Sequence, residues 1–233
     1  GKYGPAVKAL EDYLAWRPDD RLAENTLAGA RMGLAKEGQT RYIVRNAKLF
    51  NSRRADYSPM YLDRSLDQLY FTTTTEKSTG TKRSEITGMK KGDIWFATKN
   101  ERGEWKRPEA VEGELNTEVD EGTPAFSPDG QTMYLSRARR EPNSNTGVEI
   151  YTSQRSDAKW SAPVKFEITA DTLSSYAHPA VSPDGNWLYF TSDMPGGQGG
   201  RDIWRINLKE RAGSLENLGE WINTPGDEMF PTF

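Results

Sequence analysis

The chain of 233 residues contains no cysteine. Disulfide bonds, zinc–thiolate sites and cysteine nucleophiles are therefore excluded within it, although this absence does not fix a cellular compartment. The chain also contains a single histidine, His178. A Ser-His-Asp triad formed within this chain would have to use that residue, and a metal site built on several histidines is excluded.

Long apolar runs and a strong charge of one sign are missing as well. No apolar stretch approaches 18 residues, so we expect no membrane-spanning segment. The 31 basic and 34 acidic residues leave a formal net charge of −3, which argues against nucleic-acid binding driven by a basic field. Mean hydropathy is −0.82, and we expect the aromatic residues, 11% of the chain, to supply much of the core.

What the chain does contain is a repeat of about 53 residues. Residues 127–130 read Ser-Pro-Asp-Gly, and the same four residues return at 182–185. An acidic residue followed by isoleucine and an aromatic residue recurs at 93–95, 149–151 and 202–204. Self-similarity at this period indicates a radial or stacked repeat architecture.

The clearest copy of the repeat, residues 176–224, predicts four short strands. The first two, at 178–181 and 187–192, flank the Ser-Pro-Asp-Gly turn, where proline presets φ and glycine accepts a positive φ. The third, at 202–208, alternates between two faces, and we expect the fourth near 218–222. Four strands in about 50 residues match the size of a β-propeller blade.

We therefore predict a mainly β fold, a partial β-propeller of four-stranded blades over residues 39–233. The first copy of the repeat looks degenerate and carries a polar insertion from Thr72 to Lys91. Because three blades and one further strand would leave open sheet edges, we expect the chain to be a fragment of a longer protein. The copies lie at residues 57–71, 120–163 and 176–224, with the start of a fourth at 227–233.

Residues 1–38 follow a different pattern. Apolar residues fall on one helical face, Pro18 ends the first predicted helix, and Asp19 or Asp20 can cap a second helix that runs to about Lys36. The spacing within residues 1–18 resembles tetratricopeptide helices, so we assign 1–38 to a tetratricopeptide-like hairpin at the end of a longer array. The residues on the first helical face are Ala6, Leu10, Tyr13 and Leu14.

No group of residues predicts catalysis. His178 stands before a proline at the repeat position that Thr123 and Phe230 hold in other copies, which favours a structural side chain over a catalytic base. The acidic pairs at 120–121 and 227–228 suggest paired carboxylates. Both pairs share one repeat position, however, which favours a role at the start of a strand.

Three further acidic residues recur with the repeat. Asp93, Glu149 and Asp202 each precede the isoleucine of the predicted third strand. We expect their carboxylates to hold a loop or a neighbouring strand by hydrogen bonds.

A glycine-rich loop and two basic segments remain as candidate binding sites. Residues 196–200 raise a phosphate-binding hypothesis, but no helix or Gly-Lys-Ser/Thr ending follows, so a strand connection is favoured. Two basic segments could contact an acidic partner or a lipid headgroup: the lysine-rich insertion 77–91 and the residues Arg137, Arg139 and Arg140. Basic loops of this kind are most often simply solvated, and this interpretation is favoured. We predict no catalytic, cofactor-binding or metal-binding residue.

The combination of these motifs resembles a known repeat. Residues 182–185, 199–204 (Gly-Gly-Arg-Asp-Ile-Trp) and 223–228 (Asn-Thr-Pro-Gly-Asp-Glu) are similar to the Pro-Asp-type, WD-like propeller repeat shared by TolB and OmpA-family proteins of the Bacteroidetes. With tetratricopeptide helices before the propeller, the order resembles the PorE-like lipoproteins of the type IX secretion system.

This resemblance implies a non-catalytic periplasmic scaffold, associated with the outer membrane, that binds secretion-system or envelope proteins. In that family, a separate OmpA-like domain binds peptidoglycan, and no residue of this chain corresponds to it. The implied role is to help tether a secretion machine to the outer membrane and the cell wall.

Two alternatives from other functional classes stay open. A propeller can frame the active site of a prolyl-oligopeptidase-like enzyme, but the chain contains no Gly-x-Ser-x-Gly elbow. A glycan-binding or uptake accessory protein could stack sugars on Trp187, Tyr189 or Trp204. The repeat-aligned positions of these aromatic residues favour packing within the core instead.

Overall fold

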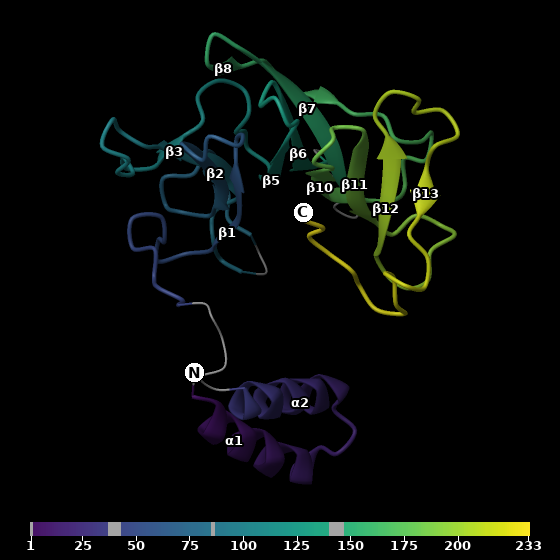
Figure 1. Ribbon diagram of the computed structural model, residues 1–233. Helices are drawn as coiled ribbons and strands as arrows, with labels where there is room; N and C mark the ends of the chain where they lie inside the picture. The colour runs from purple at the N-terminus through teal and green to yellow at the C-terminus, as the bar shows by residue number, and fades with distance from the viewer. Residues whose placement is uncertain (1, 37–42, 85–86, 140–146) are drawn as a thin grey trace. The chain divides into compact units, whose positions relative to one another are not determined.

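The computed structural model describes residues 2–36, 43–84, 87–139 and 147–233. The chain forms two compact units, residues 1–46 and 47–233 (Figure 1). The boundary predicted between residues 38 and 39 lies outside the described residues. Within the described part, no helix is long and apolar enough to cross a membrane.

The N-terminal unit is a pair of α-helices, α1 (Tyr3–Trp16) and α2 (Arg21–Ala35). Asp20 caps α2, because its Oδ1 accepts a hydrogen bond of 3.0 Å from the backbone N–H of Ala23. Gly33 gives α1 room: a Cβ at this position would lie 2.6 Å from the Tyr3 ring. The predicted helices and the predicted cap are confirmed.

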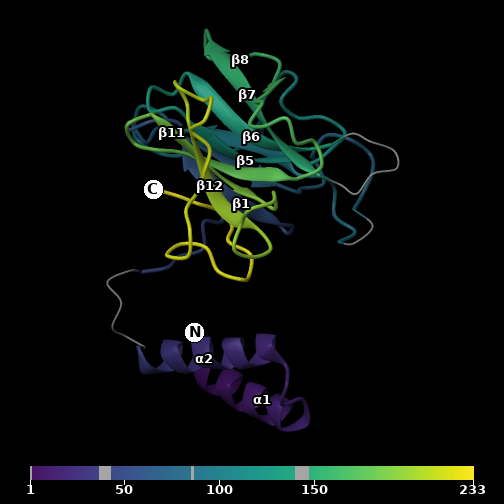
Figure 2. The ribbon, with the colours of Figure 1, turned by 90° about the vertical axis from the view of Figure 1, so that its right-hand side faces the viewer.

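The second unit consists of three antiparallel sheets, which we call blades 1, 2 and 3 (Figures 1 and 2). Blade 1 consists of β1 (Asp56–Tyr61), β2 (Gln68–Thr73), β3 (Asp93–Thr98) and β4 (Glu109–Ala110). Blade 2 consists of β5 (Glu121–Phe126), β6 (Thr132–Ala138), β7 (Val148–Ser156), β8 (Lys159–Trp160) and β9 (Val164–Lys165). Blade 3 consists of β10 (Tyr176–Val181), β11 (Trp187–Ser192), β12 (Asp202–Asn207) and β13 (Glu216–Asn217).

The strands of each blade follow one another in chain order, and β8 and β9 both pair with β7. The mainly β, propeller-like fold predicted from the repeat is confirmed. Blade 1 was expected to be degenerate, yet it forms all four strands.

The predicted fourth strand at 218–222 is wrong. Strand β13 pairs with β12 only at Glu216 and Asn217. The backbone N–H of Leu218 still reaches the carbonyl of Ile203 (3.2 Å), and Gly219, with φ +69°, then turns the chain away. Asn217 fixes this turn, because its Oδ1 accepts from the N–H of Gly219.

The core lies between the blades. Side chains of β6 alternate in direction, so that Met133 and Leu135 pack toward blade 1 while Tyr134 packs toward blade 3. Trp160 and Tyr70 pack between blades 1 and 2, and Phe190 and Trp204 pack between blades 2 and 3.

The two Ser-Pro-Asp-Gly turns have the same internal bonds. In blade 3, Ser182 Oγ accepts from the N–H of Trp187 (3.0 Å) and donates to Asp184 Oδ1 (2.5 Å). The Ser182 hydroxyl, followed by donors from Asn186, lowers the pKa of Asp184 to about 2. Gly185 adopts φ +71°, as glycine readily does.

Candidate axial pocket

One backbone feature recurs in the first, inner strand of each blade and once more after blade 3. Ser58, Thr123, His178 and Phe230 have φ angles of 50°, 50°, 52° and 57°, and a proline follows each of them. The register of β1, β5 and β10 shifts at these positions, as at a β-bulge. A non-glycine residue at positive φ is strained, and such strain is found preferentially at functional sites.

Hydroxyl groups of the preceding blade hold the bulges of blades 2 and 3 in place. The N–H of Thr123 donates to Thr72 Oγ1 (2.8 Å), and the N–H of His178 donates to Ser136 Oγ (2.9 Å). Thr72 and Ser136 occupy the same position of the second strand in blades 1 and 2. The bulges of blades 2 and 3 are therefore each built by two adjacent blades.

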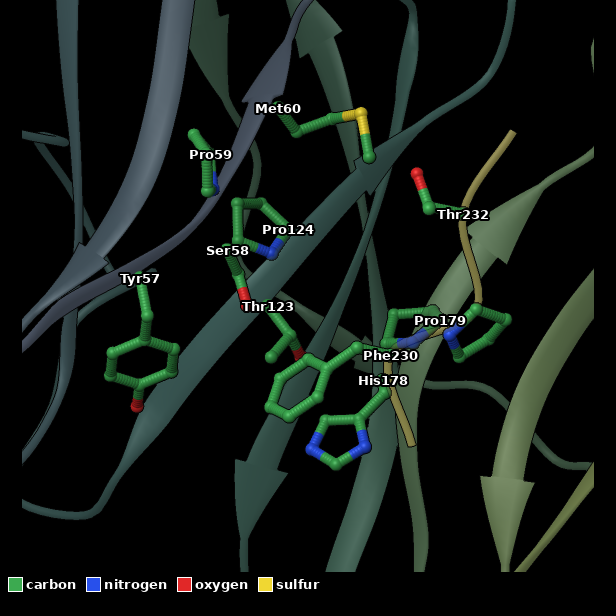
Figure 3. Close-up of a pocket in the computed structure, with 11 residues that line it drawn as sticks. Tyr57, Ser58, Pro59, Met60, Thr123, Pro124, His178, Pro179, Phe230 and Thr232 are labelled. Carbon is green, nitrogen blue, oxygen red and sulfur yellow. The ribbon is translucent and has the colours of Figure 1, made fainter. Parts of the chain in front are cut away.

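The bulges surround a cavity of about 330 Å³, which we call the axial pocket (Figure 3). None of its lining residues is charged, and four of them are prolines. The lining comes from the inner strands of all three blades and from the segment after Asp227. The lining residues are Tyr57, Ser58, Pro59, Met60, Thr123, Pro124, His178, Pro179, Phe230, Pro231 and Thr232.

Two polar atoms of this lining are buried without a hydrogen-bond partner in the described part of the chain. They are Ser58 Oγ and His178 Nδ1. The His178 ring stacks on Phe230, with centroids 3.9 Å apart and an interplanar angle of 24°. Burial, followed by the charge of Arg201, lowers the pKa of His178 to about 4, so the imidazole is neutral near pH 7.

This arrangement does not form a catalytic set. His178 has no carboxylate to orient it and no hydrogen bond to Ser58 among the described residues. The same part of the chain holds no group of three or more His, Asp or Glu side chains placed to bind a metal. An uncharged, proline-rich cavity with a neutral imidazole suits binding of an uncharged ligand.

The first repeated acidic pair lies at the junction of blades 1 and 2, and the second follows blade 3. Glu121 accepts from the N–H of Thr117 (2.9 Å) and from its hydroxyl (2.5 Å), and Glu228 binds Thr224 in the same way. Asp120 accepts from the N–H of Gly92 (2.8 Å). These contacts give both pairs a structural role. The first pair stands at the start of β5, as expected, whereas no strand follows Asp227 and Glu228 in the described residues.

The other repeated carboxylates also hold backbone. Asp93 accepts from the N–H of Thr79, and Asp202 accepts from the N–H of Gln198. Glu149 lies 3.3 Å from Arg139 Nε and 2.9 Å from Lys165 Nζ. The expectation for Asp93 and Asp202 agrees with these contacts, while Glu149 binds two cations instead.

The glycine-rich loop connects β11 to β12 and is closely covered by the backbone of 224–226. A Cβ at Gly199 would lie 2.3 Å from the Thr224 carbonyl oxygen, and the N–H of Gly200 donates to the carbonyl of Gly226 (2.8 Å). The glycines are needed for this close approach.

Most basic side chains of the two segments bind acidic side chains or backbone carbonyls of the same chain. Arg83 pairs with Glu76 (2.6 Å), and Lys91 pairs with Asp120 (2.8 Å). Arg137 donates to the carbonyls of Glu114 and Leu115. Residues 85–86 and Arg140 lie outside the described residues.

The three aromatic residues considered for sugar stacking differ in their surroundings. Trp204 is buried in the core between blades 2 and 3. Trp187 lies under the guanidinium of Arg205 (4.3 Å), and Tyr189 packs edge-on against Phe233. Core packing therefore holds for Trp204, while the other two are half-buried.

One repeated hydrogen-bond arrangement was not predicted from the sequence. Asn116 binds both the N–H (2.7 Å) and the carbonyl (3.0 Å) of Ile94, and Asn223 binds Ile203 in the same way. The Asn-Thr pairs at 116–117 and 223–224 carried this signal in the sequence.

No protein-family model matches the chain, and a search of curated proteins finds no match. Solved structures show a distant similarity to β-propeller proteins. TolB from Acinetobacter baumannii is 20% identical with a TM-score of 0.43, and the match covers 73% of this chain and 33% of that protein.

Two hydrolases show a similar distant likeness. A puromycin-hydrolyzing peptidase from Mycobacterium tuberculosis is 13% identical (TM-score 0.45), and the match covers 72% of this chain and 22% of the peptidase. An alpha-L-arabinofuranosidase from Lactobacillus brevis is 14% identical (TM-score 0.40), with 71% of this chain and 55% of the enzyme covered. The chain thus spans less than two thirds of each of these proteins, and the likeness concerns the fold alone.

Proposed function

We propose that this chain is a non-catalytic module that binds protein partners, with the axial pocket as a docking site for an uncharged, apolar segment. The observation that supports this most directly is the pocket lining, which contains four prolines, Met60 and Phe230 and no charged residue. Apolar walls supply affinity for an apolar segment, and a few polar groups orient it.

The polar groups of the pocket suit a peptide. Ser58 Oγ and His178 Nδ1 are buried and unpaired among the described residues. A peptide backbone carries both N–H donors and carbonyl acceptors, so it can pair with a hydroxyl and with a neutral imidazole. A charged ligand would instead lose its hydration without gaining a counter-charge.

The chemistry needed for an enzyme is not assembled at this pocket. His178 has a pKa of about 4, and no carboxylate among the described residues orients it, so it is a weak general base. We therefore favour binding over hydrolysis. A turnover of peptide or ester substrates by the purified chain that was lost in His178→Phe would contradict this.

We further propose a periplasmic role, near the outer membrane, as an adaptor of the type IX secretion system. This rests on the sequence signatures at 199–204 and 223–228 and on the helices that precede the propeller. In the resembled family, a separate domain binds peptidoglycan, so the proposal for this chain covers secretion-system or envelope proteins only.

Site-specific photo-cross-linking tests both parts of the proposal. A benzophenone side chain replaces Phe230 at the pocket or, as the matched control, Leu173, which is 89% exposed and lies away from the pocket. We expect a discrete cross-linked protein from position 230 and none from 173. An envelope or secretion component in that product supports the adaptor role.

Two other results would contradict the proposal. Equal products from positions 230 and 173 would show that the pocket is not a docking site. Binding on a glycan array that disappeared in Tyr189→Ala would favour the glycan-binding alternative.

A further inference from the structure

A second pocket lies between blades 1 and 2, away from the axial pocket. Its volume is about 270 Å³, and Tyr70, Phe96 and Trp160 supply aromatic walls. Tyr70 and Trp160 are buried (3% and 8% exposed), and Trp160 Nε1 donates to the Tyr70 hydroxyl (3.2 Å). We call this cavity the inter-blade pocket, and its remaining lining residues are Glu109, Val111, Glu112, Gly113, Ala158 and Lys159.

The carboxylates of this pocket have no cation. Glu109 and Glu112 are exposed, and neither makes an ion pair or a side-chain hydrogen bond with a described residue. Lys159 also lies at the pocket, but it is exposed and its ammonium binds neither carboxylate. The pocket therefore combines aromatic surface with two carboxylates that no described cation pairs with.

In blade 3, the positions that correspond to Phe96 and Glu109 contain a cation and its carboxylate partner. The register pairs Tyr189 with Arg205 and Arg205 with Glu216, just as it pairs Tyr70 with Phe96 and Phe96 with Glu109 in blade 1. Arg205 of blade 3 thus takes the place of Phe96, and Glu216 takes the place of Glu109.

The Arg205 guanidinium contacts three side chains of blade 3. It lies 2.7 Å from Glu216 Oε2, reaches the hydroxyl of Tyr189 (3.4 Å) and covers the ring of Trp187 (4.3 Å). In blade 1, phenylalanine replaces this arginine, so Glu109 keeps its carboxylate but has no guanidinium to bind it.

Another repeated position also places a cation on an aromatic ring. In blade 1, Lys99 pairs in register with Trp105 and lies 5.0 Å above its ring. In blade 2, Arg155 pairs in register with Trp160, but its guanidinium donates to Gln68 Oε1 (3.3 Å) instead. Trp160 therefore has no cation from its own hairpin.

We propose that the inter-blade pocket binds the guanidinium of an arginine side chain that a protein partner presents. A planar guanidinium can bind a carboxylate with two parallel hydrogen bonds and can stack on an aromatic face, which an ammonium does less well. Phe96 stacks on Tyr70 with one face (5.3 Å), and it lines the pocket. The inference rests on the proposed function only in taking a protein as the source of the arginine.

The first test is a titration of the full chain with the tripeptide acetyl-Gly-Arg-Gly-amide, followed through the NMR signal of the Trp160 indole N–H. The same peptide with lysine or glutamine at the centre serves as the ligand control. We expect the arginine peptide to shift this signal at the lowest concentration and the glutamine peptide not to shift it. Equal responses to arginine and glutamine would overturn the proposal.

Charge variants give the sharper test, because they predict opposite signs. Glu109→Gln should weaken binding about tenfold, whereas Lys159→Gln should strengthen it, since Lys159 opposes an incoming cation. Glu101→Gln removes a charge of the same sign from an exposed loop elsewhere in blade 1 and should change nothing. Equal effects of Glu109→Gln and Glu101→Gln would also overturn the proposal.

Phe96→Arg supplies the missing guanidinium from within the chain. It should abolish binding of the arginine peptide, because the new side chain pairs with Glu109 as Arg205 pairs with Glu216. A thermal melt checks that this variant folds. If it does not fold, the Glu109 and Lys159 variants test the arginine-binding proposal instead. Cross-linking at position 230 reports on the axial pocket alone, so failure of either proposal is recognised separately.

Discussion

The backbone N–H of Thr123 donates a hydrogen bond of 2.8 Å to Oγ1 of Thr72, across the junction of blades 1 and 2. The same bond recurs between His178 and Ser136 (2.9 Å) at the next junction. Thr191 stands at the corresponding position of blade 3, but its buried Oγ1 has no partner in the described part of the chain. Blade 3 therefore serves as an internal control for the contribution of this hydrogen bond to stability.

We expect Thr72→Val to lower the free energy of unfolding by about 1–3 kcal/mol, because it leaves the N–H of Thr123 buried and unpaired. Thr191→Val removes a hydroxyl that has no described partner, so it should be neutral or slightly stabilising. Urea unfolding of both variants measures the difference, provided that the m-value stays constant. An equal loss in the two variants would show that the inter-blade bond does not contribute.

The Ser-Pro-Asp-Gly turn of blade 3 contacts the same turn of blade 2. A Cβ at Gly185 would lie 3.2 Å from Cδ of Pro128, and Gly185 also has φ +71°. Gly219 has nearly the same φ (+69°) but no atom within 4 Å of its Cβ position.

Gly185→Ala should therefore destabilise the fold more than Gly219→Ala. Both variants carry the cost of a left-handed alanine, about 1–2 kcal/mol, and only Gly185→Ala also disturbs the contact between blades. Thermal unfolding compares the two. Equal shifts in Tm would mean that the turns of blades 2 and 3 move apart without cost.

Local sequence signals predicted the elements whose bonds are local. Strand β11 (Trp187–Ser192) has the predicted limits, because a Ser-Pro-Asp-Gly turn sets its start and a run of aromatic and apolar residues favours a pleated surface. Asp20 was recognised as a possible cap for the same reason, since a cap depends on residues three positions apart.

The parts that escaped prediction depend on distant residues. The short β13 is set by a side-chain turn at Asn217 and by a backbone bond to Ile203, neither of which hydrophobic alternation reveals. The axial pocket needs three bulges and the segment after Asp227, which come from different parts of the chain. Serine, threonine, histidine and phenylalanine share one strained position there, and only the proline that follows marks it in sequence.

Glu121 should make the protein less stable as the pH rises. Its side chain is fully buried, and burial raises its pKa to about 7, against donors from Thr117 and the charge of Arg137. Since the folded pKa exceeds the ordinary value of 4.5, the stabilisation is complete below pH 4.5 and is lost as the pH rises to about 7. In Glu121→Gln, this loss, up to about 3 kcal/mol, should disappear from urea unfolding measured across that window.

His178 should have the opposite effect, because its pKa is lowered to about 4 by burial. Its stabilising effect is complete above pH 6.5 and is lost as the pH falls toward 4, since the unfolded chain takes up the proton first. The two groups therefore oppose each other between about pH 4.5 and 6.5, and wild-type stability should change little there. Burial also raises the pKa of Asp93, which adds to the effect of Glu121.

The single variants should separate these opposing contributions. His178→Phe keeps an aromatic ring against Phe230 and should become more stable as the pH falls from 6.5 to 4.5, because Glu121 and Asp93 then act unopposed. Glu121→Gln should become less stable over the same interval, because only Asp93 then opposes His178. Slopes of the same sign in the two variants would show that one of these side chains is hydrated in the folded protein. The double variant should keep only the smaller pH dependence that Asp93 contributes.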